Sequence, residues 1–359
     1  MSQYFLGENL IFIISQPRSG STLLQRVLAG HPEIQTSAET WMMLHPVYAL
    51  RNAGIETEYD SRFASQGMLE FLTHYTDGEE VHLDAIREWA RVIYENALKK
   101  GGKAYFLDKT PRYFFIIPEL YRLFPKAKFI FLIRNPMAVL ASELSTYVNG
   151  DWKVLGIFRP DLIHAPQYLL DGIQLLGDRA VVIRYEDFVR TPEKSITALC
   201  NQLGITYHES MLNYDKTPKP MGSMNDPVGI DLHTRPSAAS VDKWRNMSND
   251  PQSRHFAISY LDVLGHRVIE ALGYSYGEIR DGLEAGKHGA LRGADIFPWD
   301  IAIRPQNDWN FREWFAAEQY FAIKRKGKIK GRLSALKQGL LHAYQLLKQQ
   351  LHTRRGIDD

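Results

Sequence analysis

The feature that most constrains this chain is a glycine- and hydroxyl-rich turn between a short apolar run and a helical pattern. The run is Leu10–Ile14, and the turn reads Gln16-Pro17-Arg18-Ser19-Gly20-Ser21-Thr22-Leu23 before a helix expected to end at Gly30. In a strand–turn–helix unit, backbone N–H groups and the positive end of the helix dipole attract anions. The serine and threonine hydroxyls and the Arg18 guanidinium can donate further hydrogen bonds. The sequence therefore predicts an anion-binding turn after the first strand.

The turn departs from the ATP-binding motif G-x-x-x-x-G-K-[ST]. Ser15 stands at the first glycine position and Ser21 at the lysine position. No acidic residue on a later strand is an obvious magnesium ligand, so ATP-dependent phosphotransfer is poorly supported. Two simpler interpretations stay open: a plain helix start with Ser19 as its N-cap, and a protein that binds a nucleotide without catalysis.

Short apolar runs alternate with helical patterns over the first 205 residues, which predicts an α/β fold with a central, mainly parallel sheet. Helices are expected to cover both faces, because the runs are apolar throughout. The helices should include one that begins at Pro136 and one that begins at Thr191-Pro192. The predicted strands are Leu10–Ile14, Ala104–Leu107, Lys128–Ile133 and Ala180–Arg184.

We expect one domain over residues 1–273 and a helical extension over residues 274–359. Within the domain, residues of about 40–100 are predicted to form a helical insertion, with an apolar stripe of Ile86, Trp89, Ile93 and Leu98. Residues of about 213–246 are rich in Pro, Gly, Ser and Asn. A loop of this length in a compact protein is typical of a lid.

A second anion site is predicted where the strand Lys128–Ile133 ends. Arg134 follows the strand directly, at the edge where open α/β sheets bind ligands. Ser142 lies about two turns along the next helix, on a face that Arg134 could share. A surface arginine and a solvated serine are the alternative.

These motifs together resemble those of sulfotransferases that use 3′-phosphoadenosine 5′-phosphosulfate (PAPS). The turn with Arg18 is similar to that of tyrosylprotein sulfotransferases and bacterial relatives. The resemblance implies a P-loop-type three-layer fold, PAPS as cosubstrate, no required metal, and transfer of a sulfuryl group to a hydroxyl. It implies that the 5′-phosphosulfate is bound by Arg18, Ser19, Gly20, Ser21, Thr22 and Leu23, and the 3′-phosphate by Arg134 and Ser142.

Two further segments extend the resemblance. Val181–Asp187, followed by Thr191-Pro192, resembles the family's fourth strand and the turn after it, which implies that Tyr185 lies near the nucleotide. Arg235-Pro236, ahead of Trp244, is similar to a Lys-Pro in tyrosylprotein sulfotransferases. Arg235 would then bind a phosphate when the lid closes. Ser223 is a second lid candidate, and Asn225-Asp226-Pro227 resembles a turn in bacterial members.

The reaction needs a proton acceptor and a positive charge near the breaking bond. Lys109, directly after the second predicted strand, is the candidate for the charge. Pro111 occupies the position of the histidine base of the cytosolic enzymes, and Glu39 resembles the catalytic glutamate of tyrosylprotein sulfotransferases. The alternative for Glu39 is a carboxylate at a helix N-terminus. Asp108, His45 and His233 are the reserve candidates for the base.

Composition sets limits on partners and location. The net charge of +2 gives no reason to expect nucleic acid binding. Cys200 is the only cysteine, which excludes internal disulfides and favours a reducing, cytoplasmic setting. No apolar stretch reaches the ~20 residues of a membrane-spanning helix. The acceptor is a hydroxyl compound of unknown type: a metabolite, a lipid, a sugar or a peptide tyrosine.

The C-terminal region is basic. Between Lys324 and Lys330, five of seven residues are Lys or Arg. The residues that follow repeat at steps of three and four and predict an apolar seam on a helix. This seam could pack on the chain's own domain, form a homodimer or contact a membrane surface. Its members are Leu333, Leu336, Leu340, Tyr344, Leu347 and Leu351.

Overall fold

The computed structural model describes residues 5–216, 219–222, 234–285 and 296–355. Contacts divide the chain into two compact units. The first unit comprises Met1–Val139, Asp161–Lys243 and Glu270–Tyr274, and the second comprises Leu140–Pro160, Trp244–Ile269 and Ser275–Asp359. This division differs from the expected boundary at residue 273, because residues 140–160 and 244–269 group with the C-terminal helices.

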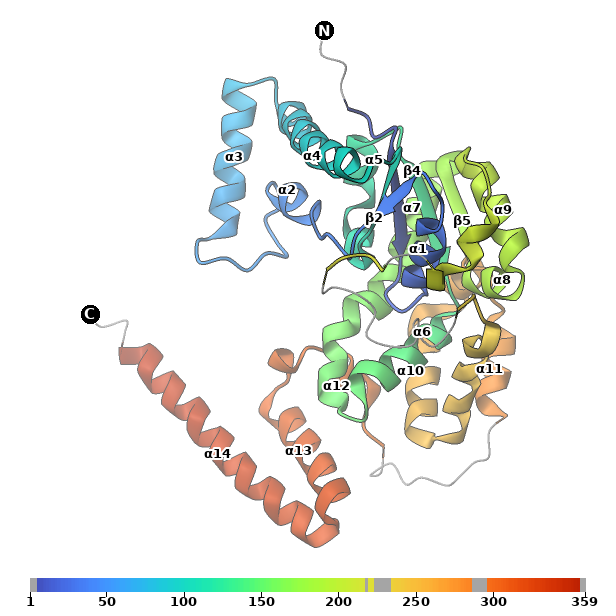
Figure 1. Ribbon diagram of the computed structural model, residues 1–359. Helices are drawn as coiled ribbons and strands as arrows, with labels where there is room; N and C mark the ends of the chain where they lie inside the picture. Colours follow the sequence, from blue (N-terminus) through green and yellow to red (C-terminus); the bar gives the residue numbers. More distant parts are fainter. Residues whose placement is uncertain (1–4, 217–218, 223–233, 286–295, 356–359) are drawn as a thin grey trace. The chain divides into compact units, whose positions relative to one another are not determined.

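The first unit is built on a five-stranded parallel sheet in the order β2-β3-β1-β4-β5 (Figure 1). Ile13 of the central strand pairs with Lys109 on one side and Ile130 on the other. Because the strands are parallel, their carboxyl ends meet at one edge, which is where such sheets bind ligands. The strands are β1 (Leu10–Ser15), β2 (Ile34–Thr36), β3 (Tyr105–Lys109), β4 (Lys128–Ile133) and β5 (Ala180–Arg184).

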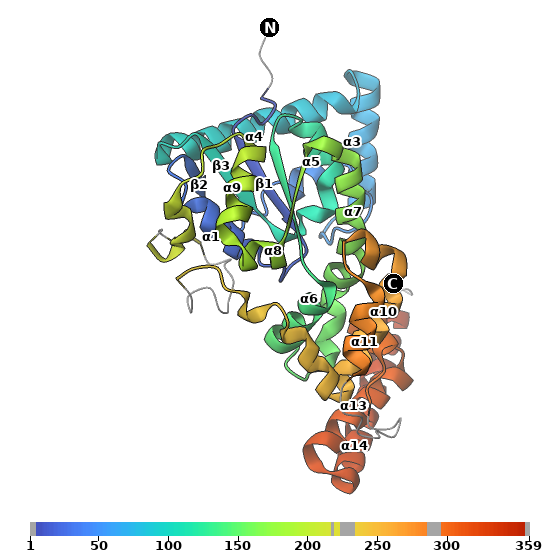
Figure 2. The same cartoon turned by 90° about the vertical axis from the view of Figure 1, so that its right-hand side faces the viewer.

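Helices cover both faces of this sheet, as the apolar strands require. Figure 2 shows α1 (Ser21–Ala29), α8 (Tyr185–Arg190) and α9 (Pro192–Leu203) on one side. On the other side lie α5 (Ile117–Leu123) and α7 (Ala165–Leu176). Ile11 and Ile13 point into the core formed with α1, α8 and α9. The predicted three-layer α/β fold is therefore confirmed.

The predicted insertion contains α2 (Leu44–Tyr48), α3 (Ser61–Tyr75) and α4 (Glu79–Gly101). The stripe predicted on α4 is partly wrong, because Trp89 and Ile93 are 41% and 37% exposed. The buried face of α4 includes Tyr94 instead, whose hydroxyl donates a hydrogen bond to the buried carboxylate of Asp108 in β3. Its buried residues are Leu83, Ile86, Ala90, Tyr94 and Leu98.

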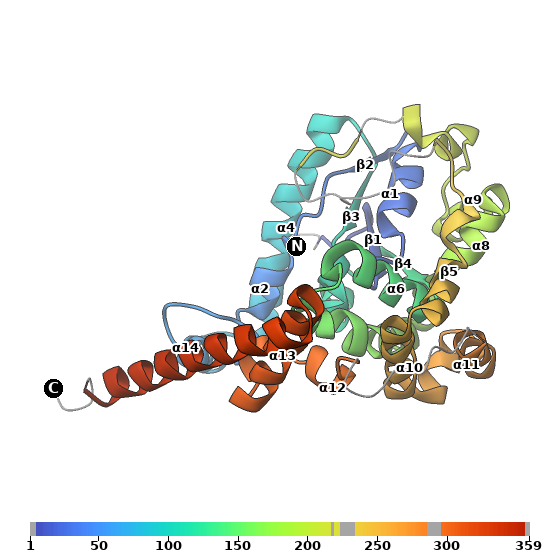
Figure 3. The same cartoon turned by 90° about the horizontal axis from the view of Figure 1, so that it is seen from below.

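The second unit is helical and has an aromatic core. Phe256 packs edge-to-face against Trp152 and Trp299, with ring centroids 5.1 Å and 5.5 Å away. In Figure 3, the two last helices lie side by side. None of the described helices is long and apolar enough to cross a membrane. The remaining helices of the chain are α6 (Pro136–Glu143), α10 (Pro251–Ala271), α11 (Tyr276–Glu284), α12 (Trp299–Ala302), α13 (Phe311–Lys326) and α14 (Lys328–Arg355).

Candidate active site

The predicted anion-binding turn lies between β1 and α1, at the carboxyl edge of the sheet. Its backbone is left-handed at Arg18 (φ 63°) and at Gly20 (φ 89°). Left-handed residues in a turn bring neighbouring N–H groups to face the same side. Gly20 is the N-cap of α1, and no described side chain caps the helix. The alternative with Ser19 as N-cap is therefore wrong, and the first N–H groups of α1 can serve a ligand.

Two buried polar atoms, one in this turn and one on Arg134 after β4, could serve an anionic group. Ser19 is fully buried, and its Oγ has no hydrogen-bond partner among the described residues. Arg134 donates from Nη1 to the carbonyl oxygen of Arg18 over 2.7 Å, while its buried Nε is likewise unpartnered within the described ranges. A buried donor without a partner costs about 1–3 kcal/mol. Oxygens of phosphate or sulfonate groups could satisfy such donors.

Tyr185 borders the turn, and its predicted place near a nucleotide stays a prediction. Its ring lies so close to Gly20 that a Cβ on this glycine would be 2.5 Å from Tyr185 Cε2. The Arg134 guanidinium carbon lies 4.2 Å from the centroid of the same ring. Burial lowers the pKa of the Arg134 guanidinium, whereas Tyr185 and Glu186 raise it. Burying a cation is costly, and an anion bound next to it offsets this cost. The Arg134 guanidinium therefore favours the binding of an anion.

Lys109 and Glu39 meet beside this turn. Lys109 Nζ lies 2.8 Å from Glu39 Oε1 and 3.4 Å from Thr22 Oγ1. The Lys109 side chain is almost completely buried, and the other Glu39 oxygen accepts a hydrogen bond from Trp41 Nε1 over 3.2 Å. The structure therefore brings the predicted proton acceptor, Glu39, within hydrogen-bond distance of the predicted positive charge, Lys109.

Asp108, a reserve candidate for the base, lies behind this pair with its oxygens occupied. The carboxylate accepts hydrogen bonds from the hydroxyls of Tyr94 (2.7 Å), Thr40 (2.9 Å), Tyr113 (3.0 Å) and Thr110 (3.3 Å). Burial raises the pKa of the Asp108 carboxyl, and the four donors oppose this rise. Because Thr40 follows Glu39 and Thr110 follows Lys109, Asp108 fixes the two segments that carry the pair. This arrangement suits Asp108 to holding these segments in place, and a role as base stays a prediction.

The remaining predicted residues are not part of this cluster. Ser142 lies on α6 among residues that group with the second unit, so its relation to Arg134 stays a prediction. Arg235 is exposed, and its main-chain carbonyl accepts from the Tyr214 hydroxyl over 3.4 Å. His45 is exposed at the start of α2. The candidates Ser223, Asn225-Asp226-Pro227 and His233 lie outside the described residues.

Several residues of the site carry no sequence signal that could have identified them. Trp41 holds Glu39 from a left-handed backbone (φ 53°), which is uncommon for a bulky residue. The Tyr185 hydroxyl is 2.8 Å from Ser240 Oγ. Gln16, which begins the turn, donates from Nε2 to the carbonyl oxygen of Asp161 over 2.7 Å, and Asp161 pairs with Arg112. All these contacts join segments that are distant in the sequence or depend on one unusual backbone conformation.

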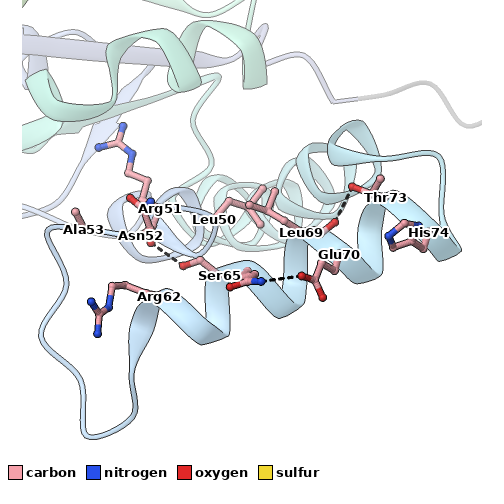
Figure 4. A pocket seen from close by; sticks show the side chains of 11 residues that line it. Leu50, Arg51, Asn52, Ala53, Arg62, Ser65, Leu69, Glu70, Thr73 and His74 are labelled. Atoms are coloured by element: carbon pink, nitrogen blue, oxygen red, sulfur yellow. Dashed lines mark hydrogen bonds between the residues drawn. The ribbon is translucent and has the colours of Figure 1, made fainter.

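A separate hollow of about 820 Å³ lies along α3 (Figure 4). Its polar side chains largely pair with neighbours: Ser65 Oγ donates to the Arg51 carbonyl oxygen, and Gln66 to Glu70. None of the predicted site residues lines it. In the described part of the chain, no three His, Cys, Asp or Glu side chains are grouped so that they could hold a metal ion.

Comparison with known proteins identifies the family. A family model described as "Sulfotransferase family" matches residues 10–209, which include the turn with Arg18, Arg134 and the Lys109–Glu39 pair. The chain belongs to the sulfotransferase family. This sulfotransferase-family chain also shares its fold with the sulfotransferase domain of an olefin synthase from Synechococcus PCC 7002. The TM-score is 0.51 at 24% identity, covering 77% of this chain and 98% of that one.

Curated relatives match parts of the chain. Nodulation protein NoeE from Sinorhizobium fredii is 35% identical over 139 residues, which are 38% of this chain and 32% of that protein. A putative protein-tyrosine sulfotransferase from Caenorhabditis briggsae is 27% identical over 226 residues, 61% of this chain and 74% of that protein. Protein-tyrosine sulfotransferase 2 from Gallus gallus is 29% identical over 213 residues, 58% and 54% of the two chains. This chain therefore spans between a third and three quarters of the length of these relatives.

Proposed function

We propose that this protein transfers a sulfuryl group from PAPS to a hydroxyl of an acceptor. The observation that carries the proposal is the Lys109–Glu39 pair, with Nζ and Oε1 2.8 Å apart, next to Thr22 of the anion-binding turn. Membership of the sulfotransferase family supports the class of reaction. The names of the protein-tyrosine sulfotransferases support a hydroxyl acceptor, and a peptide tyrosine is one of the classes to test.

In this proposal the turn binds the 5′-phosphosulfate of the donor. The N–H groups at the start of α1 and the unpartnered Ser19 Oγ would receive its oxygens. Arg134, which follows β4, would bind the 3′-phosphate, because an anionic partner stabilises its buried guanidinium. Ser142 and Arg235 stay predicted donor contacts that rest on the family motif alone.

The Lys109–Glu39 pair suggests how the reaction is controlled. Without substrate, Glu39 neutralises the buried Lys109. A bound anionic donor offers Lys109 a second partner, which leaves Glu39 to accept the proton of the acceptor hydroxyl. The acceptor oxygen then bonds to sulfur while the bond from sulfur to the 5′-phosphate oxygen breaks. Lys109 stabilises the charge that develops on this leaving oxygen.

A cytoplasmic setting, favoured by the single buried Cys200, belongs to the same proposal. ATP-dependent phosphotransfer and nucleotide binding without catalysis are the competing functions, and both are outcomes of the experiment below.

The test compares Glu39→Gln with the wild type. Labelled PAPS is offered with tyrosine peptides, sugars, lipids and metabolites, and affinity for adenosine 3′,5′-bisphosphate is measured by calorimetry. Loss of the proton acceptor should lower transfer by about 10²–10⁴-fold. Nucleotide affinity should not fall, because Glu39 is not among the proposed donor contacts and its loss leaves the positive charge of Lys109 in place. Glu33→Gln, the same change at an exposed position of the same segment, should leave both unchanged.

Three results would count against the proposal. Transfer that survives Glu39→Gln would remove Glu39 as the base. Tighter binding of ADP than of adenosine 3′,5′-bisphosphate would favour a phosphotransferase. Nucleotide binding by the wild type without transfer to any acceptor would favour a non-catalytic protein.

A further inference from the structure

The last two helices form a hairpin whose contact face consists of small residues. Gly331, Ala335 and Gly339 of α14 recur every four residues and are buried. A Cβ on Gly331 would lie 2.5 Å from the Cα of Ile323 in α13, so the two backbones nearly touch. A Cβ on Gly339 would lie 2.7 Å from the Phe315 ring. This face of α14 is therefore fixed against α13.

A second face of α14 is apolar and exposed. We call Ile329, Leu333, Leu336, Leu340 and Tyr344 the apolar stripe; each is more than half exposed. With about 100° between successive helix residues, the stripe spans an arc of about 80°. Its centre is about 140° around the helix from the three small residues. Packing on α13 therefore leaves the stripe uncovered.

Charge distinguishes the stripe from an ordinary helix surface. Ten of the 43 Lys and Arg residues, and none of the 41 Asp and Glu residues, lie between Ala322 and Ile357, so the rest of the chain is net acidic. The helical spacing puts Lys330 and Lys337 on one side of the stripe and Arg332 on the other. Basic side chains that border an apolar face can extend to a charged surface while the face is buried.

These observations decide between the possible occupants of the stripe. A second copy of the chain would bring two basic helices together, and their like charges would repel. An anionic lipid surface offers apolar chains for the stripe and negative headgroups for the flanking basic residues. We infer that α14 is a peripheral membrane helix that places its apolar stripe in the interface of an anionic bilayer.

The inference is independent of the proposed function and is tested without donor or acceptor. The full chain is sedimented with vesicles of phosphatidylglycerol and phosphatidylcholine, and with vesicles of phosphatidylcholine alone, at low and high salt. We expect binding to the anionic vesicles that weakens in high salt, and much weaker binding to the neutral ones.

Two matched variants separate burial of the stripe from charge alone. Leu340→Asp and Gln338→Asp add the same charge to exposed positions of α14, on the stripe and away from it. Leu340→Asp should weaken binding at least about tenfold more than Gln338→Asp, because only Leu340 is buried in the lipid. Circular dichroism checks that both variants keep the helical content of the wild type.

The inference is overturned by any of three results. One is absence of binding to anionic vesicles. Another is an equal loss of vesicle binding in Leu340→Asp and Gln338→Asp, which would mean that electrostatic attraction alone holds the helix on the membrane. The third is a lipid-free dimer in analytical ultracentrifugation that Leu340→Asp dissociates, because the stripe would then bind a second copy of the chain.

Discussion

At the scale of single residues, the anion-binding turn depends on the absence of a side chain. Gly20 has φ 89°, which an L side chain rarely adopts, and it lies against the Tyr185 ring. The ring cannot easily retreat, because the Arg134 guanidinium lies over it and its hydroxyl is 2.8 Å from Ser240 Oγ. Sterics and backbone conformation thus both require glycine here.

Gly20→Ala should therefore weaken binding of adenosine 3′,5′-bisphosphate by about 5- to 150-fold, since a strained residue costs about 1–3 kcal/mol. Calorimetric titration measures the loss. The control is Gly67→Ala in α3, where an added Cβ meets no atom within 4 Å and the backbone is helical. That change should leave affinity unchanged and raise stability by about 0.4–1 kcal/mol. Equal affinity of Gly20→Ala and the wild type would show that the turn does not bind the nucleotide.

The sequence indicated the main residues of the candidate site but not the contacts that hold them in place. Lys109 and Glu39 are 70 residues apart in the sequence, and the match to a family motif, not their spacing, suggested that they act together. Asp108 stood out only as an acid near Lys109. Its four hydroxyl donors come from the segments after Glu39 and Lys109, from Tyr113 and from α4, so only the folded chain shows these contacts.

At the scale of elements, burial decided what could be predicted. The strands β4 and β5 have the predicted bounds, and β1 is one residue longer. The runs of β1 and β4 are apolar because both faces of these strands are buried, whereas β5 lies at the sheet edge and has Val182 45% exposed. The strand β2 was missed since Ile34-Gln35-Thr36 is short and mostly polar. On α4, spacing alone could not show that a tyrosine would turn inward to reach Asp108.

The hairpin of α13 and α14 gives a prediction at this scale. Gly331→Ala should destabilise the hairpin by roughly 1–3 kcal/mol, because the new Cβ meets backbone atoms of Ala322 and Ile323 that cannot move independently. Trypsin should then cleave the basic turn between the two helices faster. Gln338→Ala, at an exposed position of α14, is the control and should be cleaved like the wild type. An unchanged cleavage rate in Gly331→Ala would mean that the close contact with α13 does not form.

At the scale of the whole molecule, the two units carry different chemistry. The sheet, the anion-binding turn, Arg134 and the Lys109–Glu39 pair belong to the first unit. The second unit has an aromatic core and ends in the basic hairpin. The boundary expected at residue 273 rested on the change in sequence character after Gly273. That change could not show that residues 140–160 and 244–269 group with the C-terminal helices.

This division predicts how a donor analogue affects unfolding. A ligand that binds only the folded first unit stabilises it by about 2.7 kcal/mol at a concentration of one hundred times Kd. For a unit of 150–250 residues, this raises the unfolding temperature by roughly 5–10 °C. In scanning calorimetry, adenosine 3′,5′-bisphosphate should therefore move one of two transitions, and Arg134→Gln should reduce this shift. ADP, without the 3′-phosphate, should have a smaller effect. A single transition that moves as a whole would contradict the prediction, because the two units would then unfold together and share the ligand's stabilisation.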